Sequence, residues 1–233
     1  MSSGMRSTRS SAGTGGTLAR RSRDRVTERS TSTTNADGRR LEIVDRAAAL
    51  FDKHGYHQTS MEDIAAAVGI RKPSLYHYFS SKEEILGLIH DAFIDVLIQR
   101  EVDRLNSALR AREHLLEIIS DMFDVIGTQR ASVRVFFEYY RELPRQQKAR
   151  IREKRRSYQS MVEDVIRGGM SSGEFRQLDP TLTTLALFGM VNWSYQWLQH
   201  GDLNPREIAR LFWEILVRGL AAMDHPTIKQ NLV

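Results

Sequence analysis

The strongest constraint on the fold of this chain is a helical period that begins near residue 39 and continues to its last turns. Apolar residues recur every three or four positions, and nowhere do β-branched residues alternate with polar ones over the length of a strand. Three prolines, Pro73, Pro180 and Pro205, stand where helices are expected to begin. The pattern predicts an all-α protein with about nine helices. The expected helices cover residues 39–54, 60–68, 72–78, 82–109, 112–128, 131–141, 145–169, 180–199 and 205–223.

The positive charge of the chain is concentrated near its beginning. The 233 residues carry a formal net charge of +5, and residues 1–40 hold nine arginines against three acids. That segment has a net charge of +6, which leaves −1 for residues 41–233 and excludes a uniformly basic binding protein. Residues 1–38 are rich in Ser, Thr, Gly and Arg and are predicted to be disordered, because they have too few apolar side chains to offset the entropy of ordering. Their arginines form either a solvated tail or an arm that follows phosphates or enters a minor groove.

Several classes of site are excluded by composition. The chain has no cysteine, so disulfides, thiol catalysis and cysteine-ligated metals are ruled out. The seven histidines are scattered, and we expect neither a metal site nor a cofactor. No run of about 18 apolar residues is present, and the arginines near the start are not followed by the apolar segment of a secretory signal. We therefore expect a soluble cytoplasmic protein without a membrane partner.

The most informative stretch is residues 59–79. It reads as two short helices joined by a tight turn at Gly69, where glycine permits a positive φ. Ala65 and Ala66 are small enough for the second helix to cross close to the first. A small core is expected from Ile64, Val68, Ile70, Leu75 and Phe79. This arrangement is a helix-turn-helix, in which the second helix enters the major groove of DNA.

Residues 39–98 resemble the DNA-binding domain of TetR-family transcriptional repressors. Val68 replaces the alanine that is usual in this family, which is a conservative departure. The matching positions are Ala47-Ala48-Ala49-Leu50-Phe51, Gly55-Tyr56, Thr59, Ile64-Ala65, Gly69-Ile70, Ser74-Leu75-Tyr76-His77-Tyr78-Phe79 and Ser81-Lys82-Glu83-Glu84-Ile85-Leu86.

The resemblance implies which side chains contact DNA. Tyr76 in such proteins commonly reaches a phosphate, whereas Phe79 is expected in the core. An alternative for Tyr76 and Tyr78 is that they only pack within the helical domain. The expected DNA contacts are Arg39, Arg40, Thr59, Ser60, Lys72, Pro73, Ser74, Tyr76, His77 and Lys82.

Residues 99–233 exceed what a DNA-binding domain requires and are expected to form a helical bundle for ligand binding and dimerisation. TetR-like repressors bind palindromes as two-fold dimers, so we expect a homodimer on an operator. Two apolar stripes near the end of the chain are expected at the dimer interface, although a purely intramolecular core is the alternative. The interface residues are Leu182, Leu185, Gly189, Met190, Phe212, Ile215 and Leu216.

Aromatic and polar residues of the same region are candidates for an effector pocket, with packing in the core as the alternative. They are Phe123, Phe137, Tyr140, Arg141, Tyr158, Asn192, Trp193, Gln196 and Trp197. Residues 187–197 resemble a helix of TetR-like repressors of fatty-acid and sterol degradation, several of which respond to coenzyme A thioesters. The basic run between Arg145 and Arg156 is either a solvated helix face or a partner for coenzyme A phosphates.

The sequence thus predicts a dimeric repressor that binds a palindromic operator and is released by a small hydrophobic effector, with an acyl-coenzyme A as the candidate. The first alternative is an enzyme, but the chain lacks the phosphate loop, the zinc motif, the nucleophile elbow and the dinucleotide fingerprint. The second is an architectural DNA-binding protein without a ligand. Such a protein would show steep salt dependence and little sequence preference.

Overall fold

The computed structural model describes residues 37–105, 107–198 and 204–220. These residues form nine α-helices and two short 3₁₀ helices, with no β-sheet, so the all-α prediction is confirmed for this part of the chain. The arginine-rich segment 1–36 lies outside the described residues. Contacts divide the chain into two units, residues 1–43 and 44–233, and the second unit holds all the sites considered below except Arg39 and Arg40. Among the described residues, none of the helices has the length and apolar character needed to cross a membrane.

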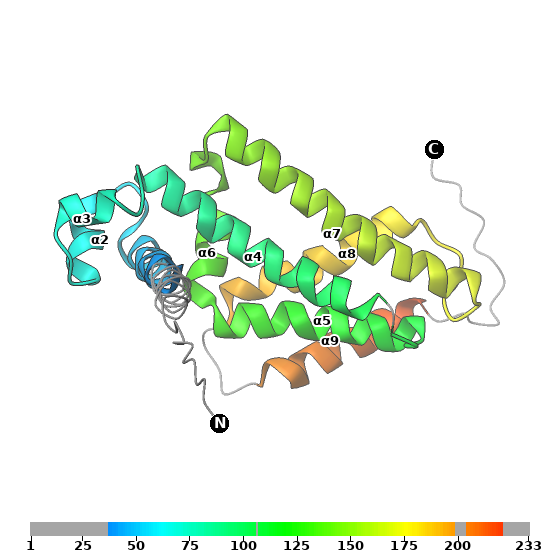
Figure 1. Ribbon diagram of the computed structural model, residues 1–233. Coiled ribbons are helices and arrows are strands. Elements are labelled where there is room, and N and C mark those ends of the chain that lie inside the picture. Colours follow the sequence, from blue (N-terminus) through cyan, green and yellow to red (C-terminus); the bar gives the residue numbers. More distant parts are fainter. Residues whose placement is uncertain (1–36, 106, 199–203, 221–233) are drawn as a thin grey trace, which may run out of the picture. The chain divides into compact units, whose positions relative to one another are not determined.

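The first helix covers residues 37–54 and spans the boundary between these units. The elements that follow it along the chain are labelled in Figure 1. They are α2 (Met61–Ala67), α3 (Lys72–Tyr76), α4 (Lys82–Arg104), α5 (Ala111–Thr128), α6 (Arg130–Glu138), η1 (Tyr140–Glu142), α7 (Arg145–Ser171), α8 (Pro180–Asn192), η2 (Trp193–Gln196) and α9 (Pro205–Leu220).

Local sequence signals set the ends of the first helices. Gly55 has φ of +86° after the helix over residues 37–54, and Gly69 has φ of +70° after α2, as the two expected turns require. Ser60 caps α2, because its hydroxyl accepts a hydrogen bond from the Asp63 backbone N–H while the Asp63 carboxylate accepts one from the Ser60 N–H. Ser81 caps α4 in a similar way.

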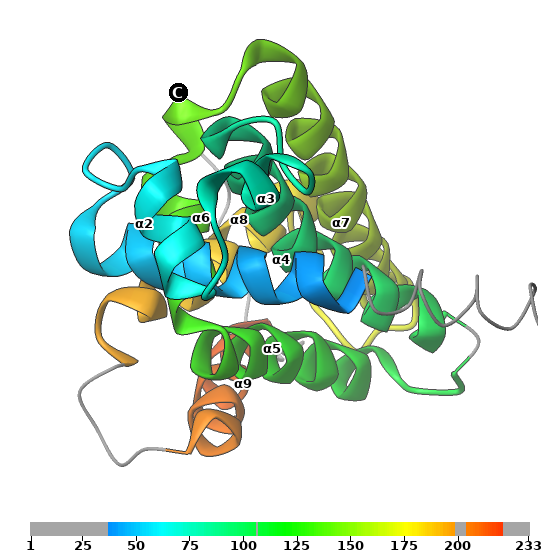
Figure 2. The same cartoon turned by 60° about the vertical axis from the view of Figure 1, so that its left-hand side comes forward.

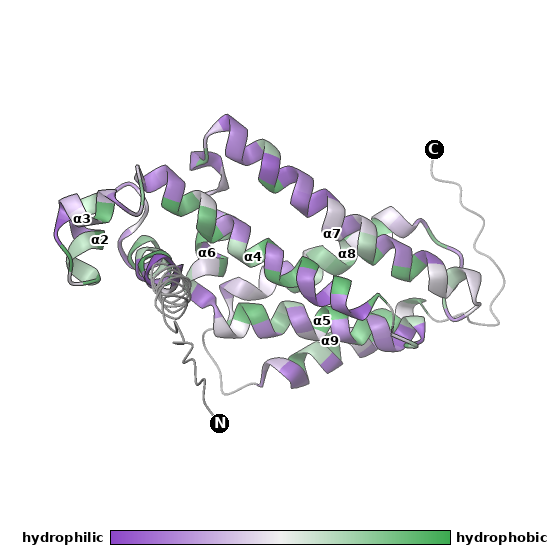
Figure 3. Ribbon diagram, viewed as in Figure 1, coloured by the Kyte–Doolittle hydropathy of each residue, from purple (hydrophilic) through white to green (hydrophobic). Residues whose placement is uncertain are grey.

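Helix α5 lies at the centre of the carboxyl-terminal bundle. It contacts α4, α6, α7, α8 and α9, while α4 also packs along α7 (Figures 1 and 2). Its side chains Leu115, Ile118 and Phe123 are fully buried. Burial of each such side chain contributes about 1.5–3 kcal/mol. The first half of α7 is, by contrast, mostly hydrophilic (Figure 3).

A buried ionic network fixes the end of α4 against α5. Glu101 is 1% exposed, lies 2.6 Å from His114 Nε2 and accepts a hydrogen bond of 3.0 Å from Arg104. Arg104 also donates to Asp121 at 2.5 Å, and Asp121 accepts a further bond from Arg100. Buried charges require such complete pairing, so the network holds the end of α4 firmly against α5.

Several expected helix ends are wrong. Helix α3 ends at Tyr76 rather than residue 78, and α6 ends at Glu138 rather than residue 141. Helix α4 ends at Arg104 rather than residue 109, and α8 ends at Asn192, where the chain tightens into η2. Helix α7 instead continues through Gly168-Gly169 to Ser171. Gly169 is buried there, and a side chain at this position would collide with Phe175. The glycine therefore permits a close approach between neighbouring segments rather than ending the helix.

Candidate nucleic-acid interface and apolar cavity

The helix-turn-helix is formed by α2, the turn at Gly69 and α3. Four of the five expected core residues, Ile64, Val68, Leu75 and Phe79, are at most 7% exposed, and Ile70 is half-buried. The turn is closed by backbone hydrogen bonds, including one of 3.0 Å from the Ile70 N–H to the Ala65 carbonyl. This small core presents the opposite side of α3 to solvent.

The exposed side of α3 carries residues that are expected to contact DNA. Lys72, Pro73, Tyr76 and His77 are exposed, and Ser74 is half-buried. The Lys72 ammonium pairs with the Glu62 carboxylate of α2, and this hydrogen bond raises the pKa of Lys72. The lysine is therefore charged and held at the α2–α3 edge, where a phosphate oxygen would compete with Glu62 for it.

Two of the expected DNA contacts are engaged inside the protein. Thr59 is 2% exposed, and its hydroxyl donates to the Gly55 carbonyl at 2.9 Å, so this hydroxyl does not reach the surface. Lys82 Nζ donates to the Tyr56 and Thr59 carbonyls at 2.7 and 2.8 Å and lies 4.3 Å from the centroid of the Tyr56 ring. Both residues hold the loop before α2 against the start of α4, and a DNA contact by either of them stays a prediction.

The remaining expected contacts lie at helix starts. Ser60 is exposed but its hydroxyl serves the capping box of α2. Arg39 and Arg40 are half-buried and lie near the start of the helix over residues 37–54. Their contact with DNA stays a prediction.

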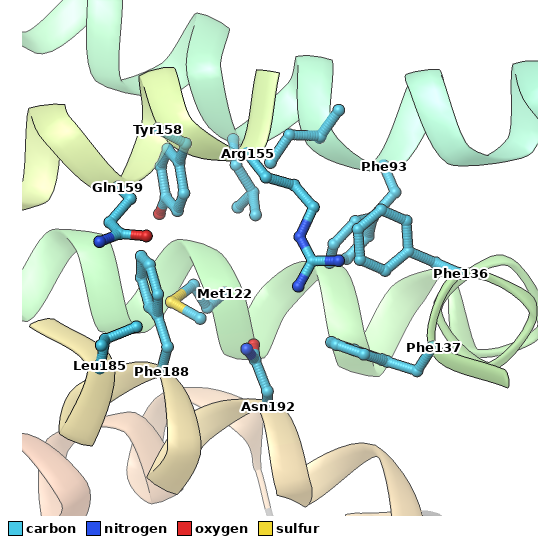
Figure 4. A pocket seen from close by; sticks show the side chains of 12 residues that line it. Phe93, Met122, Phe136, Phe137, Arg155, Tyr158, Gln159, Leu185, Phe188 and Asn192 are labelled. Carbon is cyan, nitrogen blue, oxygen red and sulfur yellow. The ribbon is translucent and has the colours of Figure 1, made fainter. Parts of the chain in front are cut away.

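A cavity of about 220 Å³ lies between α4, α5, α6, α7 and α8. Six of the side chains around it are aliphatic, phenylalanine or methionine groups of α4, α5 and α6, and three further apolar or aromatic side chains come from α7 and α8. The lining residues are Phe93, Ile94, Leu97, Met122, Phe136, Phe137, Arg155, Tyr158, Gln159, Leu185, Phe188 and Asn192 (Figure 4). An apolar cavity with few polar groups is the usual form of a small-molecule site.

Arg155 and Asn192 are two polar groups of the cavity that face each other (Figure 4). The guanidinium carbon of Arg155 lies 5.6 Å from the centroid of the Phe136 ring and 5.7 Å from that of Tyr140. The neighbouring cations Arg150 and Lys154 bind the Asp91 carboxylate instead. Among the described residues, no carboxylate forms an ion pair with Arg155. The guanidinium is therefore suited to hold an anionic or carbonyl group of a bound molecule.

Two segments of the chain match known protein families. Residues 43–89 match the family described as bacterial regulatory proteins, tetR family, and residues 108–220 match the tetracyclin repressor-like C-terminal domain. The chain belongs to the TetR family of transcriptional regulators. The family confirms the predicted DNA-binding regulator and the prediction that the protein is not an enzyme.

Individual relatives span most of this TetR-family regulator. It is 28% identical over 193 residues to the HTH-type transcriptional repressor KstR2 of Rhodococcus jostii, covering 82% of this chain and 95% of the relative. It is 26% identical over 153 residues to the fatty acid metabolism regulator protein of Bacillus subtilis, covering 65% and 79%. It is also similar to the crystal structure of AibR in complex with isovaleryl coenzyme A and operator DNA. That likeness has a TM-score of 0.69 and 27% identity, and it covers 77% of this chain and 98% of AibR.

Three of the nine expected pocket residues, Phe137, Tyr158 and Asn192, line the cavity of this regulator. Phe123 instead packs edge-on against Phe212, with 5.1 Å between the ring centroids, in the core between α5 and α9. Trp193 is 65% exposed because the chain tightens into η2 there. Four more expected residues also lie outside the cavity wall, since they are carried on η1 or at the end of η2. They are Tyr140, Arg141, Gln196 and Trp197.

Helix α4 contributes a wall of the cavity that was not predicted from the sequence. Phe93, Ile94 and Leu97 follow one face of α4 at helical spacing, a signal that was present but identical to that of a core stripe. Arg155 was noted only as part of a basic run. Its direction into the cavity depends on how α7 is rotated against α4, which the charge pattern does not specify.

The expected dimer residues on α8 and α9 include a strongly exposed apolar set. Leu182 is 65% exposed and Ile215 is 55% exposed, and Gly189 is exposed beside them on α8. Leu185 is 47% exposed but also borders the cavity. The rest of the set is half-buried and lies within this chain's own α8–α9 contact. These residues are Met190, Phe212 and Leu216.

Proposed function

We propose that this protein is a ligand-responsive repressor that binds a palindromic operator as a homodimer and is released by an acyl-coenzyme A. The observation that carries this proposal is an apolar cavity with the guanidinium of Arg155 at one end, in a chain whose other domain is a helix-turn-helix. Membership of the TetR family shows that the protein is a transcriptional regulator that binds operator DNA. The effector class, repression and the homodimer belong to the proposal.

The exposed face of α3 supports the assignment of the DNA-contacting residues. In a helix-turn-helix the second helix lies in the major groove, and Tyr76 and His77 are exposed on that helix here. Lys72 stands at its start and is suited to a phosphate contact. Loss of a phosphate contact weakens binding to every sequence, whereas loss of a base contact relaxes specificity at one position.

The cavity supports an acyl group as the part of the effector that enters the protein. Its volume of about 220 Å³ holds an apolar chain or a small ring system but not a whole coenzyme A. The nucleotide therefore stays outside, where Arg152 and Arg156 of α7 are exposed. The relatives named above include a structure with isovaleryl coenzyme A and a fatty acid metabolism regulator, which favours the same class.

The exposed apolar side chains of α8 and α9 support a two-fold dimer. Monomers rarely leave Leu182, Leu211 and Ile215 all more than half exposed on neighbouring helices without a partner surface. Four such helices from two copies would form a bundle. A dimer also explains recognition of a palindrome, because two reading heads then face two half-sites about one helical turn apart.

The test begins with selection of the operator from random DNA, followed by titration of the complex with isovaleryl-coenzyme A and octanoyl-coenzyme A. We expect binding to the selected operator about a thousandfold or more tighter than to random DNA, and release by at least one thioester. Arg155→Met is expected to weaken the effector response at least tenfold without changing operator affinity, and Arg167→Met, on an exposed arginine near the end of α7, serves as the matched control. Lys72→Ala and His77→Ala are expected to weaken operator binding without changing the effector response. Release that is equally efficient in Arg155→Met would remove the proposed effector site.

A further inference from the structure

Two side chains near the cavity have buried polar atoms without a hydrogen-bond partner in the described protein. His90 on α4 is 0% exposed, and neither of its ring nitrogens has a partner. Gln147 on α7 has a buried Oε1 that is also unpartnered. Leaving such groups unpaired costs about 1–3 kcal/mol each, so two of them in one contact between helices require an explanation.

These groups extend the two helix faces that line the cavity. On α4, His90 precedes Phe93, Ile94 and Leu97 by three, four and seven residues, so it lies on the same stripe one turn earlier. On α7, Gln147 precedes Arg155 and Tyr158 by eight and eleven residues, which again is one face of a helix.

The two stripes meet at Gly87. A side chain on Gly87 would collide with the Gln147 amide, so these helices approach closely here. Gly87 lies one turn before His90 on α4. The unpartnered Gln147 amide therefore packs against α4 one turn before His90.

Phe136 lies next to both His90 and the cavity. Its ring centroid lies 5.0 Å from that of His90 and 4.2 Å from that of Phe93, which lines the cavity. Tyr140 borders His90 on a second side, with 6.1 Å between the ring centroids. The Phe136 ring, which itself lines the cavity, thus contacts both the buried imidazole and a second residue of the cavity wall.

The imidazole offers a defined pattern of donors and acceptors. Burial and, second to it, the positive charge of Arg155 lower the pKa of His90 to about 4. The ring is therefore neutral at pH 7, with one N–H donor and one nitrogen acceptor. Gln147 Oε1 adds an acceptor. A hydroxyl group complements this set, because it accepts from the imidazole N–H and donates to the amide oxygen.

We propose that His90 and Gln147 form a specificity subsite for a hydroxyl group on the acyl part of the effector, close to the end that Arg155 holds. This inference rests on the proposed function for the cavity but makes a separate claim about the chemistry of the ligand. It assigns the effector to hydroxylated acyl compounds rather than to unsubstituted ones.

The experiment measures dissociation constants of the full chain for two pairs of probes. The first pair is octanoyl-coenzyme A and 3-hydroxyoctanoyl-coenzyme A, and the second is the corresponding free acids. We expect the hydroxylated member of each pair to bind at least about tenfold more tightly to the unaltered protein. His90→Leu and Gln147→Met are expected to bring this ratio within about threefold of one while leaving the affinity for the unsubstituted member unchanged.

Two controls separate a subsite from a packing effect. Gln146→Met changes the exposed neighbour of Gln147 and is expected to keep the full preference. His90→Leu is expected to melt at the same temperature as the unaltered protein or higher, because it removes an unpartnered buried imidazole.

The possible outcomes are distinct. A ratio near one in the unaltered protein, a ratio that survives both substitutions, or no binding of either pair would overturn the inference. If the acids show the preference and lose it in His90→Leu while neither thioester releases the operator, the subsite stands and the acyl-coenzyme A effector fails. If thioesters release the operator without any hydroxyl preference, the proposed function stands and the subsite fails.

Discussion

Lys82 illustrates, at the scale of single residues, how one side chain can match a family's DNA contact and yet be engaged elsewhere. It stands at the start of α4, where a lysine is well placed for a phosphate. In the structure its ammonium donates instead to two backbone carbonyls of the segment before α2. These carbonyls belong to Tyr56 and Thr59, which are both buried.

Lys82→Met is therefore expected to destabilise the protein. The substitution keeps most of the apolar stem but leaves two carbonyl groups without their charged donor, which costs about 1–3 kcal/mol. Urea unfolding measures this loss, and Lys53→Met on an exposed lysine is the control. Unchanged stability combined with a loss of operator affinity would restore Lys82 as a DNA contact.

The capping box of α2 gives a prediction that depends on pH. Two hydrogen bonds from Ser60 lower the pKa of Asp63, so folding favours the ionised carboxylate. Its contribution is complete above the ordinary aspartate pKa of 3.8 and is lost as the pH falls through the lowered value. Ser60→Ala is expected to cost about 1 kcal/mol at pH 7.

Asp63→Asn provides the measurement of that pH dependence. The difference in unfolding free energy between this variant and the unaltered protein is expected to be constant near neutral pH and to shrink below pH 3.8. Asp45→Asn, whose carboxylate has its pKa raised by burial, is expected not to follow this course. A difference that grows as the pH falls would contradict the role of the box.

At the scale of elements, the helical period predicted which segments are helices but not which faces meet. The stripe of Phe93, Ile94 and Leu97 reads as core until α4 is placed beside α6 and α7, where it becomes a cavity wall. The predicted positions of side chains also failed where the helical period changes from α-helix to 3₁₀ helix. After Asn192 the chain has three residues per turn, so Trp193 and Trp197 do not take the positions that a continued α-helix would give them.

Helix α6 and the η1 turn after it contact both functional regions. Phe136 and Phe137 face the cavity, while Arg134 lies 3.4 Å from the Asp52 carboxylate at the end of the helix over residues 37–54. Glu142 of η1 lies 3.3 Å from His57, in the loop before the helix-turn-helix. A ligand that moves the two phenylalanines thus acts on the segment that positions α2 and α3.

Arg134→Gln is expected to weaken this coupling. The effector is expected to bind with unchanged affinity, while the factor by which it weakens operator binding falls about threefold to tenfold. Isothermal titration of effector with and without operator measures both quantities, and Arg130→Gln on the exposed start of α6 is the control. An equal loss of effector affinity would instead place Arg134 in the effector site.

At the scale of the whole molecule, the proposed repressor requires two copies, because a single helix-turn-helix reads only half of a palindrome. The surface that would join them is the set of exposed apolar side chains on α8 and α9, from Leu182 to Ile215. Ile215→Asp is expected to give a monomer, since a carboxylate in an apolar two-fold interface meets its own copy and both charges lose water.

Sedimentation equilibrium of this variant and operator binding at matched concentrations test the dependence of DNA recognition on dimerisation. Loss of the second reading head is expected to reduce operator affinity by at least about a hundredfold, because avidity between linked sites is lost. Leu105→Asp changes a leucine that is 60% exposed at the end of α4 and is expected to leave the dimer intact. An Ile215→Asp protein that stays dimeric would move the interface away from α9. A monomer with full operator affinity would instead remove the need for two-fold recognition altogether.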